Sequence, residues 1–509
     1  MTQEIDVRIK EKYENPKRIM ASYGSREMFG QFITAAFGFN VLFYYESVIG
    51  LSSLYIMLAF TIYSLWNAFN DPLIGWIMER VKYRMPWEKK WGYRRVPWML
   101  LGAIPWIFSY LMIYMVPLTW YNTPSAVANN QLAIFGWYVI TIIIYDTLLT
   151  LYDVNVISIY PEKFPGLNER RTVQGFGTIL GILGLVLAVV LPGFFIISDP
   201  AITDNVLIAS SYQTAAFVSI GIGFIFFLFI IPGIWENKRV RERYAKRIEL
   251  PESKEIESFF RESKKAIKDK RLMLKILFFF GYQVGGVMLQ NSGRYIVTFI
   301  INAGELEFII VLGSMLLGAI ISIPLWVVLS KRINNNKKMS VIAGFAMFFT
   351  IVPMIFLPDG LTLPGFATII WAISLFLFGI GVGGQWFMDP PTMGDVLDDH
   401  AVRTGKRQQS IYYGFQALFI RLGYALIVII IATVHILTGF KEGAETLGEL
   451  IAQNPTGWQL AVFGVRLHAT IIPAIVVLIT TLIFWKFYDL TPDKVAVNKK
   501  KLKEMKIEF

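Results

Sequence analysis

The stretch LSSLYIMLAFTIYSLWNAFNDPLIGWIM, residues 51–78, places an Asn-x-x-Asn-Asp-Pro motif inside an apolar run long enough to cross a membrane. Asp71 is an ionisable side chain deep in that run, where a charge is costly and a functional role is the default interpretation. Pro72 cannot donate a backbone hydrogen bond, so carbonyl oxygens beside the carboxylate are freed. Because a carboxylate, neighbouring amides and free carbonyls suit a small cation, the motif predicts ion-coupled transport.

The composition of the whole chain agrees with a membrane setting. Of the 509 residues, 55% are hydrophobic and only 17% are charged, and the mean hydropathy is +0.52. A soluble domain would not carry repeated apolar segments of about 20 residues or more. The charged N-terminus lacks the apolar core of a cleavable signal peptide. The chain has no cysteine, which excludes disulfides and thiolate metal sites.

Hydropathy divides the chain into twelve expected membrane-spanning helices. Lys and Arg crowd alternate connections, whereas the loops 119–130, 198–211 and 358–363 carry none. This positive-inside pattern predicts a multi-pass protein of the cell membrane with both termini in the cytoplasm. The net charge of +11 therefore reflects the Lys and Arg residues that orient the protein in the membrane, and nucleic acid is not an expected partner. The expected spans are 20–48, 51–80, 97–117, 131–160, 173–197, 212–234, 272–302, 307–330, 339–358, 365–395, 410–438 and 460–487.

A polar stretch divides the expected spans six and six. The predicted organisation is an N-terminal six-helix bundle at 1–235, a cytoplasmic central linker at 236–271, a C-terminal six-helix bundle at 272–488 and a cytoplasmic tail at 489–509. The two halves repeat a spacing of charges in spans four and ten. Such a duplication predicts an all-α membrane protein with a substrate site between the halves near the midplane. The repeated charges are Asp153, Glu162 and Arg171 in the first half and Asp389, Asp398 and Arg407 in the second.

Polar residues of several spans lie at one expected depth. Asn67 and Asp71 are about 16 and 20 residues into span two, which at about 1.5 Å per residue puts them at the depth of three polar residues of span four. Those three, Asp146, Thr150 and Asp153, are spaced i, i+4 and i+7 and so lie on one helix face. Polar residues of spans one and eleven reach the same level. The expected layer consists of Asn67, Asp71, Asp146, Thr150, Asp153, Gln31 and Arg421.

Arg421 and two histidines raise separate questions. Arg421 cannot deprotonate near mid-bilayer and needs an anion, which is either Asp71 or Asp153 in a salt bridge or a group on the substrate. His435 and His468 lie near the outer ends of their spans, where an interfacial position is the expectation and a proton relay is the alternative.

Several motifs together resemble the glycoside–pentoside–hexuronide:cation symporters, the melibiose-permease-like branch of the major facilitator superfamily. The resemblance covers spans one to five and ten to eleven. It implies the fold of two six-helix bundles in a twelve-helix membrane protein. The motifs that carry it are Ser22-Tyr-Gly, Gly50-Leu-Ser, Asn67-Ala-Phe-Asn-Asp-Pro-Leu-Ile-Gly75, Trp91-Gly-Tyr-Arg-Arg-Val-Pro-Trp98, Pro161-Glu-Lys-Phe-Pro165 with Glu169-Arg170, Gly394-Asp395-Val, Thr404-Gly-Lys-Arg407 and Gln416 to Gly423.

The resemblance implies roles at the matching positions. In the family, two helix-two aspartates and a helix-four threonine form the cation site, and these positions are Asn67, Asp71 and Thr150 here. Helix-four and helix-one aspartates that hold sugar hydroxyls match Asp153 and Gln31, and the helix-eleven lysine matches a guanidinium. The expected residues are Asp71, Asn67, Asn70 and Thr150 for the cation, Asp153, Gln31, Asp146, Tyr152, Trp386 and Gln416 for the substrate, and Arg421 as the coupling charge.

The departures from the family pattern bear on the coupling ion. Asn67 and Gln31 each replace a carboxylate, so a single titratable Asp71 favours a proton over sodium. The expected function is cation-coupled symport of a sugar or glycoside by alternating access, by a monomer in the lipid bilayer. No cofactor is expected besides the coupling ion, H+ or Na+, and no metal other than a sodium ion at Asp71.

Two other functions stay open. One is transport of a lysolipid or another amphiphile within the same superfamily, in which Arg421 would meet a phosphate. The other is a membrane sensor that does not transport. An enzyme is not expected, because the chain carries neither a His-Glu-x-x-His nor a Gly-x-Ser-x-Gly motif.

Overall fold

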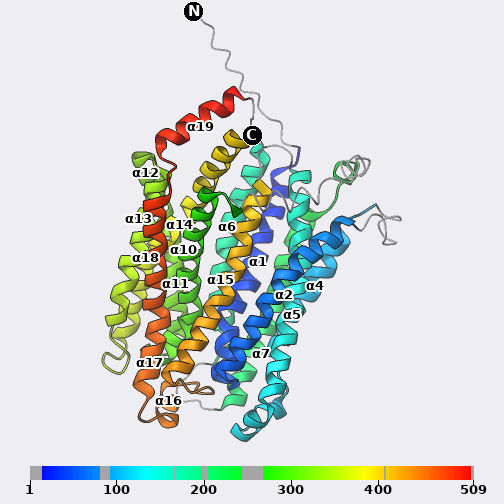
Figure 1. Cartoon of the computed structure of the whole chain (residues 1–509). Coiled ribbons are helices and arrows are strands. Elements are labelled where there is room, and N and C mark those ends of the chain that lie inside the picture. The colour runs from blue at the N-terminus through cyan, green and yellow to red at the C-terminus, as the bar shows by residue number, and fades with distance from the viewer. Residues whose placement is uncertain are drawn as a thin grey trace, which may run out of the picture.

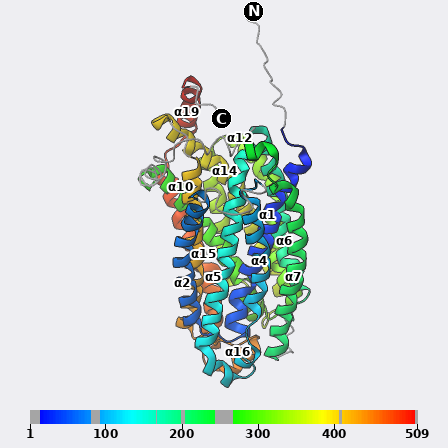
Figure 2. The same cartoon turned by 90° about the vertical axis from the view of Figure 1, so that its right-hand side faces the viewer.

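The computed structural model describes residues 14–80, 92–164, 167–197, 204–242, 267–405 and 409–505. The described residues form a long helical bundle, with the first and the last of them at one end of it and α16 (Leu447–Gln453) at the other (Figures 1 and 2). These ends are called the terminal end and the far end below. Most of the expected linker, 243–266, and Arg407 of the charge repeat lie outside the described residues.

The first bundle contains six spans. A π-helical turn, η1, continues the first of them, and a short 3-10 turn, η2 (Leu118–Trp120), follows the third. The helices are α1 (Lys17–Phe43) with η1 (Tyr44–Val48), α2 (Ser53–Arg80), α4 (Val96–Tyr114), α5 (Pro124–Lys163), α6 (Leu167–Gly193) and α7 (Asn205–Ile234).

The second bundle contains the other six spans, several of them built from consecutive helical pieces. Ten spans across both bundles are long and apolar enough to cross a membrane, and α1 and α2, with 27 and 28 residues, complete the expected twelve. The pieces are α10 (Lys270–Tyr295) with η3 (Ile296–Ile301), α11 (Glu305–Ile321) with α12 (Ile323–Ile333), α13 (Asn336–Ile351) with η4 (Val352–Phe356), α14 (Phe366–Thr404), α15 (Gln409–Thr438), and α17 (Trp458–Arg466) with η5 (Leu467–Ile471) and α18 (Ile472–Phe487). The expected all-helical fold is confirmed.

Several helices begin at capping residues outside the apolar core of their span, so they start earlier than hydropathy predicts. The Thr123 hydroxyl accepts from the Ala126 amide, and α5 begins at Pro124 instead of near residue 131. Asp204 caps α7 and Asp269 caps α10 in the same way. A side chain that satisfies the free amides of the first turn lets a helix extend through polar sequence.

The two bundles meet through three pairs of helices. The packed pairs are α1 with α10, α2 with α15, and α6 with α11. In span order these are one with seven, two with eleven, and five with eight. Span two corresponds to span eight, and span five to span eleven, so the pair two–eleven in one half-to-half order is the pair eight–five in the other. An internal duplication produces this relationship.

Within the second bundle, helices approach closely where a side chain is absent. A β-carbon on Gly379 of α14 would overlap the Met315 carbonyl oxygen of α11, so this contact requires glycine. Small residues allow membrane helices to pack by van der Waals contact, since lipid supplies no hydrophobic driving force between them.

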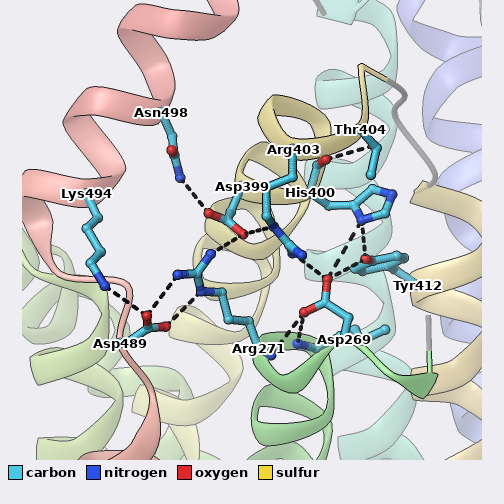
Figure 3. A network of polar contacts seen from close by, with 11 residues as sticks. Asp269, Arg271, Asp399, His400, Arg403, Thr404, Tyr412, Asp489, Lys494 and Asn498 are labelled. Carbon is cyan, nitrogen blue, oxygen red and sulfur yellow. Dashed lines mark hydrogen bonds and ion pairs between the residues drawn. The ribbon is translucent and has the colours of Figure 1, made fainter. Parts of the chain in front are cut away.

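The tail continues past the last span as α19 (Pro492–Glu504), which crosses the terminal end (Figure 1). Arg271 at the start of α10 donates two hydrogen bonds to Asp489, at 2.7 and 2.8 Å, and pairs with Asp399 of α14 at 2.5 Å (Figure 3). Asn498 of α19 donates to the same Asp399 at 3.1 Å, and Lys494 pairs with Asp489 at 2.8 Å. The tail helix is therefore fixed to the second bundle.

Candidate functional site

Three helices bring the first group of polar residues together between the bundles. Asp71 of α2 accepts a hydrogen bond from the Thr150 hydroxyl of α5 at 2.8 Å. Its other oxygen forms an ion pair with Arg421 of α15, and Arg421 also donates to the Asn67 side-chain oxygen at 2.7 Å. Of the two salt bridges that the sequence left open for Arg421, the structure shows the one with Asp71, and it joins the first bundle to the second.

Asp146 belongs to the same group, one turn before Thr150 on α5. Its oxygens accept hydrogen bonds from the Tyr63 hydroxyl at 3.1 Å and from the Asn67 and Asn70 amides at 3.3 Å each. Asn70 also donates to Thr150 at 3.1 Å. We call the set the cation cluster: Asn67, Asn70, Asp71, Asp146, Thr150 and Arg421.

Burial and charge set what this cluster can hold. Asn70, Asp146 and Thr150 are buried, whereas the side chains of Asp71 and Arg421 are 26% and 27% exposed. The cluster holds two carboxylates and one guanidinium, which stays charged at every accessible pH and pairs with Asp71. A buried charge without a partner is costly, so the cluster is suited to one further monovalent cation or proton.

Asp153 lies apart from the cluster, nearer the terminal end of α5. Its electrostatic neighbours are Arg26 and Glu27 of α1, which pair with each other at 2.6 Å. Sequence analysis missed this pair. The signal was available, because Glu27 stands four residues before Gln31 and therefore on the same helix face.

The second bundle holds a matching arrangement. Lys275 of α10 forms an ion pair with Asp389 of α14 at 2.6 Å, and the Gln416 amide of α15 bridges them, accepting from Lys275 at 2.6 Å and donating to Asp389 at 3.0 Å. Spans one and seven thus each place a cation near the repeated aspartate of span four or ten, Arg26 near Asp153 and Lys275 in an ion pair with Asp389.

A cavity of about 300 Å³ lies between the bundles. Helices α1, α6, α10, α14 and α15 line it, and its wall combines amides, a carboxylate and three aromatic rings. Tyr424 stands three residues after Arg421 on α15, so the cavity adjoins the cation cluster. The wall includes Glu27, Gln31, Gln283, Gln290, Trp386 and Tyr424.

The expected substrate residues divide among five places. Gln31 and Trp386 line the cavity, Asp146 lies in the cation cluster, and Asp153 faces Arg26. Tyr152 packs in the core with its ring stacked on Trp106. Gln416 lies in the Lys275 cluster of the second bundle. Neither Tyr152 nor Gln416 is among the described residues that line the cavity, because helix rotation, which depth counting does not provide, turns both side chains toward neighbouring helices.

Two known relatives are similar to this chain along most of their length. An uncharacterised symporter of Synechocystis sp. is 23% identical, with 92% of this chain and 93% of the relative covered. The sodium-dependent lysophosphatidylcholine symporter 1 of Mus musculus is also 23% identical, with 94% of this chain and 86% of that protein covered.

Solved structures are similar in fold. The crystal structure of a D-xylose-proton symporter matches with a TM-score of 0.56 at 14% identity, covering 92% of this chain and 97% of that one. A bacterial homologue of the human lysosomal transporter Spinster, in an inward-facing conformation, matches with a TM-score of 0.57 at 10% identity, covering 97% and 99%. A family model described as MFS/sugar transport protein matches residues 22–492. The chain, a multi-pass membrane protein with the major facilitator fold, belongs to this family of transporters.

Proposed function

We propose that the protein is a cation-coupled symporter of a sugar or glycoside that works by alternating access, with its termini in the cytoplasm. The observation that carries the proposal is the contact of Arg421 with Asp71 and Asn67 across the bundles, beside a polar cavity. An ion pair made by two moving bodies changes when they rock. Cation binding at Asp71 and the conformation of the bundles are therefore linked.

The cavity wall supports a hydroxyl-rich substrate. Gln31, Gln283 and Gln290 each offer an amide donor and an acceptor, and Glu27 offers an acceptor. Trp386 adds an aromatic face on which a sugar ring can stack. The volume lies at the small end of the range for ligand pockets, about 300–1,000 Å³.

We propose the proton as the coupling ion, because Asp71 already has a hydroxyl donor and a guanidinium beside it and can change charge without further ligands. Sodium is the second candidate, and Asp146 is the observation in its favour. Asp146 places a second carboxylate in the cluster, which offsets the charge lost at Asn67.

Lysolipid transport is the second candidate for the substrate. It is favoured by the lysophosphatidylcholine symporters among the relatives and by the partial exposure of Arg421, a cation suited to a phosphate. The polar wall of the cavity favours the sugar instead.

Uptake into proteoliposomes tests both questions together. Radiolabelled sugars, glycosides and lysolipids are supplied under a proton gradient alone and under a sodium gradient alone. Accumulation of a sugar or glycoside driven by the proton gradient is expected. Accumulation of lysolipids only would show that the substrate is a lysolipid and not a sugar. Accumulation under the sodium gradient only would show that the coupling ion is sodium and not the proton. No accumulation of any solute under either gradient would contradict symport.

A further inference from the structure

At the far end, a buried chain of titratable side chains crosses from one bundle to the other. Glu46 of η1 accepts from His435 of α15, with the ring Nδ1 2.9 Å from each carboxylate oxygen. His435 Nε2 lies 3.0 Å from His468 Nε2 of η5, and His468 Nδ1 lies 2.7 Å from the Ser292 hydroxyl. Both histidines are 0% exposed, so the expectation that they are interfacial is wrong.

Other donors complete the surroundings of Glu46, which is itself 0% exposed. The Ser53 hydroxyl of α2 donates to it at 2.6 Å, and the Tyr295 hydroxyl of α10 donates to its other oxygen. Two further titratable groups are near: Glu442, which accepts from the same Ser53 at 3.1 Å, and the Tyr138 phenol of α5, which interacts electrostatically with Glu46.

Hydrogen-bond directions limit how many protons this group holds. Glu46 receives three donors, which an ionised carboxylate accommodates. The two histidine Nε2 atoms face each other, so one of them carries hydrogen. If His435 carries hydrogen on both nitrogens, it donates to Glu46 and to His468. His468 then donates to Ser292, and Ser292 donates to the Met288 carbonyl oxygen at 2.7 Å. Every member of the chain is satisfied, and the net charge of the group is zero.

Burial favours that protonated form. With both rings neutral, the carboxylate would be a buried charge without a cation among the described side chains that contact it, which is costly. One extra proton removes the cost whether it resides on His435 or on Glu46, since in a tightly coupled pair the proton belongs to the pair.

Backbone geometry marks the same place. Glu46 lies in the π-helical turn η1, His468 lies in the π-helical turn η5, and Tyr295 immediately precedes the π-helical turn η3. Such turns are rare in proteins overall, and those that occur are often found at functional sites. Three of them converge on this group, in spans one, seven and twelve.

We propose that Glu46, His435 and His468 form a proton-binding site that, above about pH 6.5, holds one proton more when the far end is closed than when it is open. Opening would separate Glu46 of the first bundle from the histidines of the second and expose both to water. Hydrated carboxyl and imidazole groups titrate near their ordinary pKa values, about 4.3 and 6.5. Above about pH 6.5, closing the far end therefore takes up a proton, and opening releases it.

The sign of the pH effect follows from this linkage. The ratio of open to closed far end should rise with pH by up to tenfold per unit above about pH 6.5, until the closed group also loses its proton. Below that pH the open form protonates both hydrated imidazoles whereas the closed group holds one proton, so the ratio should rise again as the pH falls and be lowest near pH 6.5. The inference assumes the alternating access of the proposed function but neither its substrate nor its coupling ion.

Electron paramagnetic resonance distances test the proposal directly. The chain has no cysteine, so Asn122→Cys and Gln453→Cys, both exposed at the far end and on different bundles, can carry two nitroxides that do not titrate. The populations of short and long distances are measured in nanodiscs between pH 5.5 and 9 without substrate. The labelled protein should show a long-distance population that grows above pH 6.5.

Variants separate proton binding from simple closure. Glu46→Gln should remove the pH slope above pH 6.5, and Glu46→Ala, which also removes the carboxylate, should do the same if the first variant fails to fold. Asn40→Ala is the matched control, since it breaks the 2.7 Å contact of Asn40 with Arg294 of the other bundle and contains no group that titrates in this range. It should raise the open population at every pH and keep the slope.

Three results would overturn the proposal: a flat ratio in the labelled protein and in the Asn40→Ala background, a far end that stays closed at all pH values in both, or an unchanged slope in Glu46→Gln. Because no substrate is present, failure here is distinct from failure of symport, which the uptake assay reports separately.

Discussion

Arg421 of α15 forms an ion pair with Asp71 of α2 across the line where the two bundles meet. The same guanidinium holds the Asn67 side-chain oxygen at 2.7 Å. In the proposed mechanism a cation that binds Asp71 would compete with Arg421 for the carboxylate, so a helix of the second bundle would respond to ion binding in the first.

Replacing Asp71 by Asn should abolish accumulation while sparing exchange. The amide cannot change charge, so the gradient no longer drives the cycle, whereas the cavity is untouched. Uphill uptake and counterflow in the same proteoliposomes provide the two measurements. Full uphill transport in the Asp71→Asn protein would exclude this carboxylate as the coupling group.

The Arg421→Lys substitution should lower the rate of coupled uptake by about tenfold, equivalent to about 1.4 kcal/mol. An ammonium keeps the charge but lacks the planar fork that reaches Asp71 and Asn67 together. Arg421→Gln, which removes the charge, should lose more. Equal rates in the lysine variant and the unmodified protein would show that charge alone suffices.

Asp146→Asn discriminates between the coupling ions. Proton-driven uptake through Asp71 should fall by less than about threefold, since Asp146 makes only supporting hydrogen bonds in that mechanism. Sodium-driven uptake should fall by more than about tenfold, because a carboxylate ligand is lost. The initial rates under each gradient, measured side by side, give the answer.

Trp386→Leu should raise the KM for a sugar substrate by about twofold to tenfold, which corresponds to the contribution of an aromatic stacking contact, about 0.5–1.5 kcal/mol. Tyr152→Phe is its control. The Tyr152 hydroxyl is buried without a hydrogen-bond partner in the described structure, and its ring packs in the core. Comparable losses in both variants would point to general damage instead of substrate contact.

Glu445→Gln should stabilise the protein at pH 8 and have little effect at pH 4. This residue lies in the far-end loop before α16 (Leu447–Gln453), and burial, with Glu449 and Asp204 nearby, raises the pKa of its carboxyl from 4.5 to about 9. The folded state thus binds a proton that the unfolded state releases, so stability falls as pH rises between those values. Thermal unfolding of both proteins across this range measures the difference. A parallel pH dependence in the two would refute the assignment.

Depth counting predicted that most residues of the cation cluster lie at one level, and the structure brings them into contact. Asn67, Asp71, Asp146, Thr150 and Arg421 meet because the rise of a helix per residue is fixed, so position along a span translates directly into depth. Asp153 shares a face with Asp146 but stands about 10 Å further along the axis. At that distance its neighbour is Arg26 of α1, whereas the neighbour of Asp146 is Asn67 of α2.

The far-end group could not have been predicted in the same way. Glu46, His435 and His468 stand at the ends of three spans, where hydropathy indicates an interface. Their burial arises from helices of both bundles and from π-helical turns, and neither leaves a periodic signal in the sequence. Conversely, Tyr152 and Gln416 show that the right depth does not determine which way a helix is turned.

The attachment of α19 has a practical consequence. Because Arg271 connects the tail to α10 and α14, any group fused to α19 moves together with the second bundle (Figure 3). Energy transfer between a fluorophore on α19 and another on the terminal end of α1 would report the distance between the two bundles. The turnover of single molecules could then be followed from outside the transport pathway.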